Sequence, residues 1–284
     1  MTAIPSFTMN NGRTIPALGY GVFLMTSDQV REHLPQALKL GYRHIDTANV
    51  YFNEVAVGEV VRDAIAAGEL AREDLFITTK LFPQSYPYAQ AVEDIDATLA
   101  RLGLDYVDLL LFHQPYGEYV SGWKAMEEAV AGGKVRSIGL SNFPIAKFQE
   151  ILDVAEIIPA VHQVEAHPRW NQHELKARMS EATGTEVLVE AWYPLGHGDK
   201  TLLEEPAIAA AAQRTGATPA QVILAWHLAE RNITFPKTLS PAHMADNLAA
   251  LDVELTAAEI ATINGIPQQP YYRIPDEPPA FVLT

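Results

Sequence analysis

The sequence predicts an α/β protein built as a (β/α)8 TIM barrel. Short runs rich in Leu, Val and Ile alternate along the chain with helical stretches, the alternation typical of βα units on a parallel sheet. Eight such runs occur, and eight units over roughly 250 residues is the size of this barrel. Of the 284 residues, 48% are hydrophobic, enough to bury a large core. Because no low-complexity linker interrupts residues 15–265, we expect one domain spanning 1–284.

The barrel itself is expected at about 17–265, with strands that are short and β-branched or leucine-rich. The predicted strands are 18–23, 43–46, 75–80, 107–113, 137–141, 161–165, 187–192 and 233–237. Helices are predicted between them, for example at 29–40, 55–67, 89–102, 122–131, 146–154 and 219–230, with two more at 239–253 and 255–265. Thr218 stands at an N-cap position before Pro219, and Gly41 at a C-cap position.

Both ends of the chain depart from the βα pattern. "FTMNNGRTIP" reads as a β-hairpin over about 5–16 with its turn at Asn11-Gly12, and we expect it to cap one end of the barrel. Residues 266–284 contain too much proline for a helix or a strand. They are expected to form an extended tail over the surface.

Composition excludes several classes of partner and site. The chain has no cysteine, which excludes disulfides, thiolate metal sites and a cysteine nucleophile. A net charge of −15 argues against binding to nucleic acid or to an anionic membrane surface. No apolar run approaches the length of a membrane span, and the N-terminus lacks a secretory signal. We therefore expect a cytoplasmic protein, and a monomer.

The predicted strands end on polar residues almost without exception. Asp46, Lys80 and His113 stand at or just after the ends of strands two, three and four. The later strands end on or carry "GLSN", "HQVEAH", "EAWYPLG" and "FPKT". One polar strand end is ordinary, but so many at the carboxyl end of a barrel indicate an active site, because that is where barrel enzymes build theirs.

Three chemistries compete for this site. A metal centre is disfavoured because His162 and His167, five residues apart on one strand, lie on opposite faces, and because Lys80 repels a dication. A serine nucleophile lacks the G-x-S-x-G elbow. A Schiff base on Lys80 is the more serious alternative, although Asp46 would hold that lysine charged rather than neutral.

Asp46, Lys80 and His113, together with Tyr51, suit a different reaction. A phenol has a reference pKa of about 10 and is a poor proton donor at neutral pH. A lysine cation beside Tyr51 lowers that pKa, and a carboxylate keeps the lysine charged. The histidine can orient a carbonyl oxygen beside the phenol. The set forms an acid that protonates an alkoxide as a hydride arrives at carbon.

These motifs carry a resemblance to the aldo-keto reductase family over essentially the whole chain. "GYRHIDTANVYFNEVAVGEVV", "FITTKL", "YVDLLLFHQP", "GKVRSIGLSNF", "HQVEAHP", "AWYPLG" and "FPKT" occur in the family's order and spacing. The resemblance is to prokaryotic members similar to diketogluconate reductases. It implies an extended nicotinamide cofactor held without a G-x-G-x-x-G motif, and hydride transfer to a small aldehyde or ketone.

Carried over by position, the resemblance assigns roles to individual residues. It implies that Tyr51 is the acid, that Lys80 and Asp46 support it, and that His113 orients the carbonyl. The residues that resemble the family's cofactor-binding set are Ser141, Asn142, Gln163, Trp192, Leu195, Lys237, Thr238, His243, Asp246 and Asn247. Phe23, Phe82 and Gln114 match positions in the substrate pocket, and no metal is implied.

This chain also departs from the family pattern. His243 stands where NADPH-preferring members commonly carry an arginine against the 2′-phosphate, and an imidazole lacks the permanent charge and the fork of donors. We therefore expect NADPH to be the preferred cofactor by a reduced margin, with NADH usable. A non-catalytic subunit that binds the cofactor on the same barrel remains the alternative from another functional class.

Overall fold

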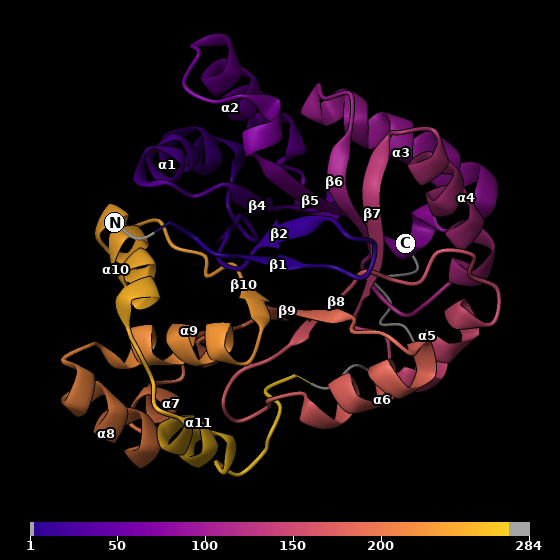
Figure 1. Cartoon of the computed structure of the whole chain (residues 1–284). Coiled ribbons are helices and arrows are strands. Elements are labelled where there is room, and N and C mark those ends of the chain that lie inside the picture. The colour runs from indigo at the N-terminus through magenta and orange to yellow at the C-terminus, as the bar shows by residue number, and fades with distance from the viewer. Residues whose placement is uncertain (1–2, 273–284) are drawn as a thin grey trace.

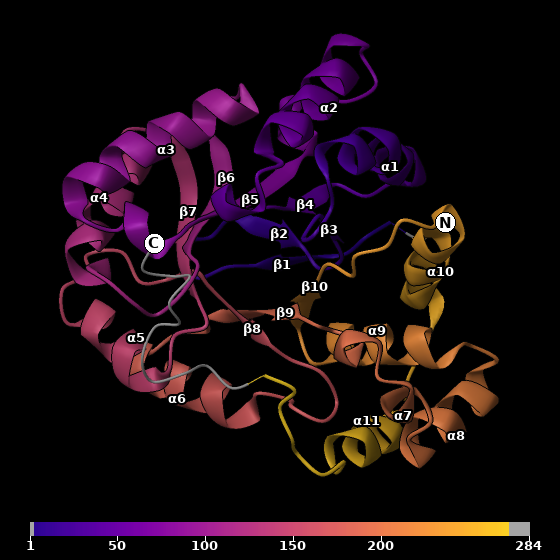
Figure 2. The same ribbon diagram turned by 180° about the vertical axis from the view of Figure 1, so that it is seen from behind.

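The computed structural model describes residues 3–272 and is built around a parallel sheet closed into a barrel. Eight strands follow one another in the order β10-β9-β8-β7-β6-β5-β4-β3. A parallel bridge between Leu18, just before β3, and Thr234 of β10 joins the two ends of this sheet. The helices lie outside this ring when it is seen from the front and from behind (Figures 1 and 2). The predicted barrel is confirmed.

The observed strands overlap the regions predicted from the hydrophobic runs, although β5, β7 and β10 each extend one or two residues beyond them. They are β3 (Tyr20–Gly21), β4 (His44–Asp46), β5 (Phe76–Leu81), β6 (Val107–Phe112), β7 (Val135–Ser141), β8 (Val161–Glu165), β9 (Leu188–Trp192) and β10 (Asn232–Thr234). The strand predicted at 233–237 was wrong at its carboxyl end, since pairing with β9 stops at Thr234. Pro236 has no N–H to donate to a sheet, so the chain leaves the ladder before it.

The helices cover the outside of the barrel. They are α1 (Ser27–Leu40), α2 (Glu54–Ala66), α3 (Tyr88–Leu102), α4 (Tyr119–Ala131), α5 (Ile145–Leu152), α6 (His173–Thr183), α7 (Lys200–Leu203), α8 (Pro206–Thr215), α9 (Pro219–Ala229), α10 (Pro241–Ala249) and α11 (Ala257–Asn264). No bounds were predicted for α6, α7 or α8. In α6, Met179 is the one buried side chain and leaves no apolar stripe to recognise. Within residues 3–272, no helix combines the length and the apolar character needed to cross a membrane.

Local capping signals were read correctly at two helices. Thr218 Oγ1 accepts from the backbone N–H of Gln221, whose side chain accepts from the N–H of Thr218, a reciprocal capping box at the start of α9. Gly41 ends α1 with φ of 109°, a conformation that favours glycine.

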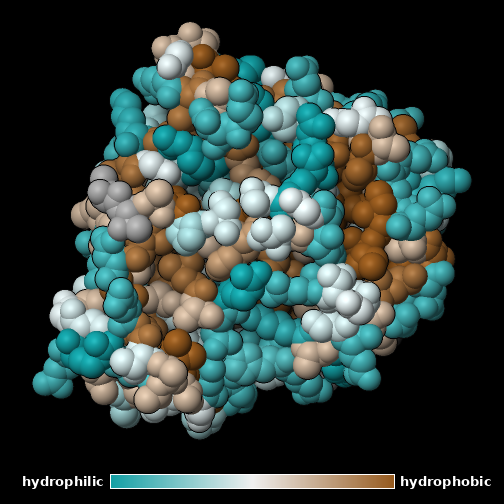
Figure 3. Space-filling view, in the orientation of Figure 1, coloured by the Kyte–Doolittle hydropathy of each residue, from teal (hydrophilic) through white to brown (hydrophobic). Residues whose placement is uncertain are grey.

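The hairpin β1 (Ser6–Thr8) and β2 (Thr14–Pro16) covers the amino end of the barrel, as predicted. Its Ile15 and Met9 are buried against residues near the starts of the strands, such as Phe76 of β5. The side chain of Asn10 donates to the carbonyl oxygen of Pro159, just before β8. Figure 3 shows the face of the molecule that carries this hairpin. Hydrophilic side chains cover most of its edge, and hydrophobic side chains are visible mainly in patches inside that edge.

The first part of the tail runs along the segment that follows β8. The backbone N–H of Gln269 donates to the carbonyl oxygen of Arg169 at 2.5 Å, and the side chain of Gln268 accepts from the N–H of Asn171 at 2.7 Å. The tail predicted at 266–284 is therefore extended over the surface as far as residue 272. Its remainder, 273–284, lies outside the described residues.

Candidate active site

A pocket of about 590 Å³ opens at the carboxyl ends of the strands. Side chains from successive strands meet there: Asp46 ends β4, His113 follows β6, Ser141 ends β7 and Gln163 lies in β8. Lys80, the fifth residue of β5, lies beneath the pocket and is fully buried. A cavity of this size, mostly apolar with a few convergent polar groups, is typical of a small-molecule site.

The base of the pocket is an ion pair buried inside the barrel. Lys80 Nζ donates to Asp46 Oδ1 at 2.7 Å and Oδ2 at 2.9 Å, and to the carbonyl oxygen of Thr47 at 2.9 Å. Burial by itself lowers the pKa of Lys80, but Asp46 and Tyr51 raise it and the net direction is upward. Burial raises the pKa of Asp46 against the lowering effect of Lys80. Since both oxygens of Asp46 accept N–H donors, the hydrogen bonding is that of a carboxylate facing an ammonium.

Tyr51 lies above this pair, on a single 3-10 turn (Asn49–Tyr51) after β4. Lys80 Nζ donates to its hydroxyl at 3.4 Å. Burial raises the pKa of Tyr51 to about 12, although Lys80 lowers it. The prediction that the lysine cation leaves this phenol more acidic than usual was therefore wrong in the net direction. Lys80 acts with the expected sign, but burial of the phenolate form has the larger effect.

His113 faces the same space from the neighbouring strand. Its ring centroid lies 5.7 Å from that of Tyr51 and 5.5 Å from that of Phe82. Burial, with a further contribution from Lys80, lowers the pKa of His113 well below its usual value, so the imidazole is neutral at pH 7. Its Nδ1 is buried without a hydrogen-bond partner among residues 3–272. With its proton on Nε2, the neutral imidazole has a donor for a ligand in the pocket.

A second polar group borders the pocket on the β7 side. Asn142, at φ of 66°, donates to the carbonyl oxygen of His113 at 3.0 Å and to Ser141 Oγ at 3.1 Å. Trp192 Nε1 donates to Asn142 Oδ1 at 2.8 Å. The amide of Asn142 thus holds the indole of Trp192 on one wall of the pocket.

Sequence reasoning missed Glu190, which is fully buried in β9. Gln163 Nε2 donates to Glu190 Oε2 and to Asp46 Oδ2, both at 2.9 Å. Burial, reinforced by the negative charge of Asp46, raises the pKa of Glu190 to about 8. An acid in the middle of the apolar run "VLVEAW" was the available signal, since a buried strand does not carry a carboxyl without a partner.

The residues expected to hold the adenosine end lie beyond the pocket. Lys237 lines the pocket rim and is exposed, while Thr238 lies on the connection to α10. Ser240 caps α10, its Oγ accepting from the N–H of His243 at 3.4 Å. His243 is exposed on the first turn of that helix. Asp246 and Asn247, one turn further on, are exposed and buried respectively.

The pocket brings most of the predicted site residues together. Its lining includes Asp46, Tyr51, His113, Ser141, Asn142, Gln163, Trp192, Leu195, Lys237, Phe23 and Gln114. The lining does not include Thr238, His243, Asp246 or Asn247. It does not include Phe82 either, whose ring contacts that of His113. The assignment of Phe82 to the substrate pocket stays a prediction, supported by the contact of its ring with that of His113.

Nine lining residues were not predicted as site residues, and His197 and Tyr272 are two of them. His197 is exposed at the pocket rim and stacks on Tyr193 with ring centroids 4.1 Å apart. Tyr272 lines the pocket from the tail. No local pattern marked either residue, since each reaches the pocket through a loop. Within residues 3–272, no group of three or more His, Asp or Glu side chains is arranged to hold a metal ion.

Known sequences resemble this chain over almost its full length. Residues 17–267 match the model described as Aldo/keto reductase family. A protein of Mycobacterium sp. (strain MCS) named aldo-keto reductase is 39% identical over 273 residues, covering 95% of this chain and 93% of that protein. The morphine 6-dehydrogenase of Pseudomonas putida is 38% identical over 274 residues, covering 92% of this chain and 90% of that protein.

Solved structures of aldo-keto reductases also resemble this chain. An aldo/keto reductase from Brucella melitensis superposes with a TM-score of 0.85 at 36% identity, covering 93% of this chain and 99% of that one. A Bombyx mori aldo-keto reductase in complex with NADP has a TM-score of 0.87 at 31% identity, covering 97% of this chain and 96% of that one.

Proposed function

Because the chain belongs to the aldo/keto reductase family, we propose that its pocket reduces an aldehyde or ketone to an alcohol, with Tyr51 as the proton donor. Members of this family are NAD(P)H-dependent oxidoreductases that act on small carbonyl compounds. One observation carries the proposal: the buried Lys80 contacts both Asp46 and the hydroxyl of Tyr51, beside a neutral His113.

The pocket has the chemical groups that a nicotinamide requires. When bound, the reduced nicotinamide supplies the hydride. Trp192 offers an aromatic platform on one wall, held by Asn142. Both N–H groups of Gln163 are taken by Asp46 and Glu190, so its Oε1 remains to accept from a carboxamide. The hydroxyl of Ser141 can donate to the same carboxamide.

The phosphate end of the cofactor has a matching site beyond the rim. Lys237 supplies a cation in a protein of net charge −15, and Thr238 supplies a hydroxyl. The first turn of α10 adds backbone N–H groups and the positive end of the helix dipole, which favour a bound phosphate. In this arrangement Leu195 borders the cofactor, and Asp246 with Asn247 would face the adenine, as the family resemblance implies.

The proton step follows from the two pKa shifts. The alkoxide formed by hydride addition is a far stronger base than a phenolate, with an alcohol pKa near that of water, about 15.7. Transfer from Tyr51 is therefore downhill even from a phenol whose pKa is about 12. Lys80 stabilises the phenolate that is left, and Asp46 keeps Lys80 charged. Before transfer, the Nε2–H of His113 holds the carbonyl oxygen beside the phenol.

The substrate side of the pocket is aromatic. We assign Phe23 and Gln114 to its wall and Phe82 to its support behind His113. The ring of Phe23 lies 5.0 Å from that of Tyr51 and so forms an apolar wall beside the proposed proton donor.

A Schiff base on Lys80 is disfavoured by the contacts of its ammonium group. A neutral, nucleophilic amine would have one donor fewer for its three acceptors and would leave the Asp46 carboxylate buried without its counter-ion. A non-catalytic, cofactor-binding subunit would quench its own fluorescence with NADPH but would not turn over an aldehyde, which separates it from the enzyme.

Replacing Tyr51 by phenylalanine tests the proton donor. Tyr51→Phe keeps the ring and removes the hydroxyl, so carbonyl reduction should fall by about 100-fold or more. NADPH binding, followed by quenching of tryptophan fluorescence, should remain within a few-fold of the wild type. Near-normal turnover in a folded variant would contradict the assignment.

Replacing His243 tests the cofactor preference. We propose that NADPH is preferred and NADH usable, because one permanently charged contact to the 2′-phosphate is missing at this position. His243→Arg should lower the KM for NADPH roughly three- to tenfold, a discounted value because the site is exposed, and leave that for NADH unchanged.

The neutral variant His243→Gln is the matched control for that experiment. It should leave the ratio of the two KM values near that of the wild type. If the arginine variant gains nothing with NADPH, residue 243 does not face the phosphate.

A further inference from the structure

Glu190 and Gln163 are register partners on the neighbouring strands β9 and β8. Glu190 is fully buried and Gln163 is 3% exposed. The amide nitrogen of Gln163 donates one hydrogen to Glu190 Oε2 and the other to Asp46 Oδ2, both at 2.9 Å. One side-chain amide therefore bridges two buried carboxyl groups.

The buried cation beside this bridge is engaged by other groups. Lys80 Nζ contacts both oxygens of Asp46, the carbonyl oxygen of Thr47 and the hydroxyl of Tyr51. Asp46 therefore has its counter-ion in direct contact, whereas Glu190 Oε1 has no hydrogen-bond partner within residues 3–272.

His44 supplies no charge to the bridge. Its Nε2 lies 3.6 Å from Glu190 Oε1, too far for a hydrogen bond. Its Nδ1 contacts the carbonyl oxygen of Pro16, which can only accept, so Nδ1 carries the proton and Nε2 accepts from the hydroxyl of Thr78. Burial lowers the pKa of His44 to about 3, so the ring is neutral at pH 7. On the β10 side, the register partner of Glu190 is the apolar Ile233.

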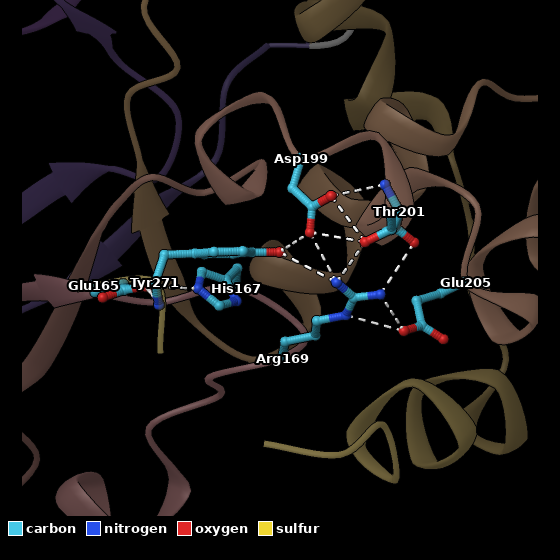
Figure 4. A network of polar contacts seen from close by, with 7 residues as sticks. All are labelled: Glu165, His167, Arg169, Asp199, Thr201, Glu205 and Tyr271. Carbon is cyan, nitrogen blue, oxygen red and sulfur yellow. Dashed lines mark hydrogen bonds and ion pairs between the residues drawn. The ribbon is translucent and has the colours of Figure 1, made fainter. Parts of the chain in front are cut away.

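The next acid along β8 belongs to a separate network (Figure 4). Glu165 accepts from the backbone N–H groups of Tyr271 and Tyr272, and His167 Nε2 lies 2.9 Å from its carboxylate. The hydroxyl of Tyr271 extends this network to Asp199, which is partly exposed. The charge of Glu165 is therefore stabilised by donors of its own.

A proton on Glu190 balances the charges inside the barrel. With one buried cation and two buried carboxyl groups, ionising both acids leaves an uncompensated negative charge in the interior. Burial, followed by the negative charge of Asp46, raises the pKa of Glu190 to about 8. At pH 7 Glu190 is therefore a neutral acid, and it loses its proton as pH rises through this value.

Gln163 connects this acid to the pocket, which Gln163 lines and Glu190 does not. The amide cannot rotate without losing its two hydrogen bonds, so its Oε1 stays available to a cofactor carboxamide. A nicotinamide held there is neutral when reduced and carries a positive charge when oxidised. A carboxylate at Glu190 attracts the oxidised form, because charges interact strongly in the protein interior.

We propose that Glu190 is a positioning residue that acts on the cofactor through Gln163 and through its own proton. As a neutral acid it fixes the amide without favouring either form of the cofactor. As a carboxylate it favours the oxidised form, so binding of NADP+ near pH 8 releases the proton of Glu190 to the solvent. The proposal rests on the proposed function in placing the nicotinamide at Gln163.

The dissociation constants of NADP+ and NADPH, measured by fluorescence quenching from pH 6 to 9, test this role. Both forms carry the 2′-phosphate, so His243 contributes equally and cancels in their ratio. The shifted pKa values of Tyr51 and His113 keep these groups from titrating in this range. In the wild type, NADP+ should gain about tenfold in affinity relative to NADPH, the effect of a pKa change of one unit. In Glu190→Gln the ratio should stay at its low-pH value, because an amide cannot ionise.

Asp108→Asn is the matched control. Burial also raises the pKa of Asp108, but this acid pairs with Arg72 and lies outside the pocket lining. The ratio in this variant should follow that of the wild type. A ratio that does not change with pH in the wild type, or one that still changes in Glu190→Gln, overturns the proposal.

Infrared difference spectra detect the proton without depending on a variant. When NADP+ binds to the wild type near pH 8, the carbonyl band of a protonated carboxylic acid should be lost. Asp108→Asn should keep this loss and Glu190→Gln should not show it. No loss in the wild type overturns the proposal.

Reduction of an aldehyde separates this role from the proposed function. If both cofactor forms bind with the expected pH dependence but no aldehyde is reduced, the proposed function fails and the role of Glu190 stands. Normal reduction with a constant ratio overturns the role of Glu190 alone. A protein that binds neither form overturns both.

Discussion

At the scale of single residues, buried charge is the main constraint on the site. Inside the barrel, Lys80 pairs with Asp46, and Gln163 bridges Asp46 to a second buried carboxyl group, Glu190. One buried cation can balance one anion, so the second carboxyl holds its proton to a higher pH, which is the direction of the shift at Glu190. Burial also controls the phenol of Tyr51: it raises the pKa of the hydroxyl by more than the nearby Lys80 cation lowers it.

The protonation of Glu190 predicts a specific dependence of stability on pH. Its pKa is raised from 4.5 to about 8 on folding, so the unfolded chain binds fewer protons than the native protein between these values. This contribution is fully present below about pH 4.5 and is lost as pH rises toward about 8. Glu190→Gln cannot titrate, and should therefore lose less stability than the wild type between pH 5 and 8.5, by on the order of a few kcal/mol.

Urea unfolding of both proteins at the two pH values measures that difference. Glutamine can still accept from Gln163, so the variant should fold. Its amide replaces an oxygen, Oε1, that has no hydrogen-bond partner within residues 3–272 and lies 3.6 Å from His44 Nε2. An equal loss of stability in the two proteins would show that Glu190 is ionised throughout this range.

At the scale of elements, close contacts between helices depend on glycine. Gly58 lies in α2 where that helix crosses the carboxyl end of α3, and a Cβ atom there would overlap the carbonyl oxygen of Leu102. Arg62, one turn later, donates to the same oxygen. The two helices can therefore approach this closely only because residue 58 has no side chain. The sequence alone shows this position only as a glycine in a helical pattern.

Gly58→Ala should destabilise the protein although alanine is the better helix former. The gain in helix propensity is about 1 kcal/mol, but the clash is with backbone and forces α2 and α3 apart, which should cost more than that gain, by about 1–3 kcal/mol. The temperature of thermal unfolding should fall by several degrees. Gly132→Ala, at φ of −77° beyond α4, is the control and should be close to neutral.

At the scale of the whole molecule, the two ends of the barrel have different tasks. The hairpin closes the amino end with Ile15 fully buried, whereas the pocket and its loops occupy the carboxyl end. A barrel can lose packing at one end without moving the side chains at the other, since the strands between them are rigid.

Ile15→Ala should separate stability from activity. Deleting a buried isoleucine side chain is expected to cost about 2–5 kcal/mol, and Ile15→Val about 0.5–1.5 kcal/mol. At a temperature where both variants remain folded, the KM for NADPH and for the carbonyl substrate should equal those of the wild type. A changed KM in either variant would mean that the hairpin influences the mouth.

The sequence by itself determined the barrel, its hairpin and the family. Strand runs, helix caps and the residues that end each strand are local patterns, and the carboxyl ends of parallel strands must meet at one edge. Asp46, Lys80 and His113 could therefore be assigned to one site from the order of residues alone. Only the tertiary structure decided the pairing of Gln163 with two carboxyl groups, the net pKa shift of Tyr51, the position of Phe82 behind His113 and the contact of Tyr271 with Asp199. Burial and distances between segments far apart in the chain control these features, and no local pattern encodes either quantity.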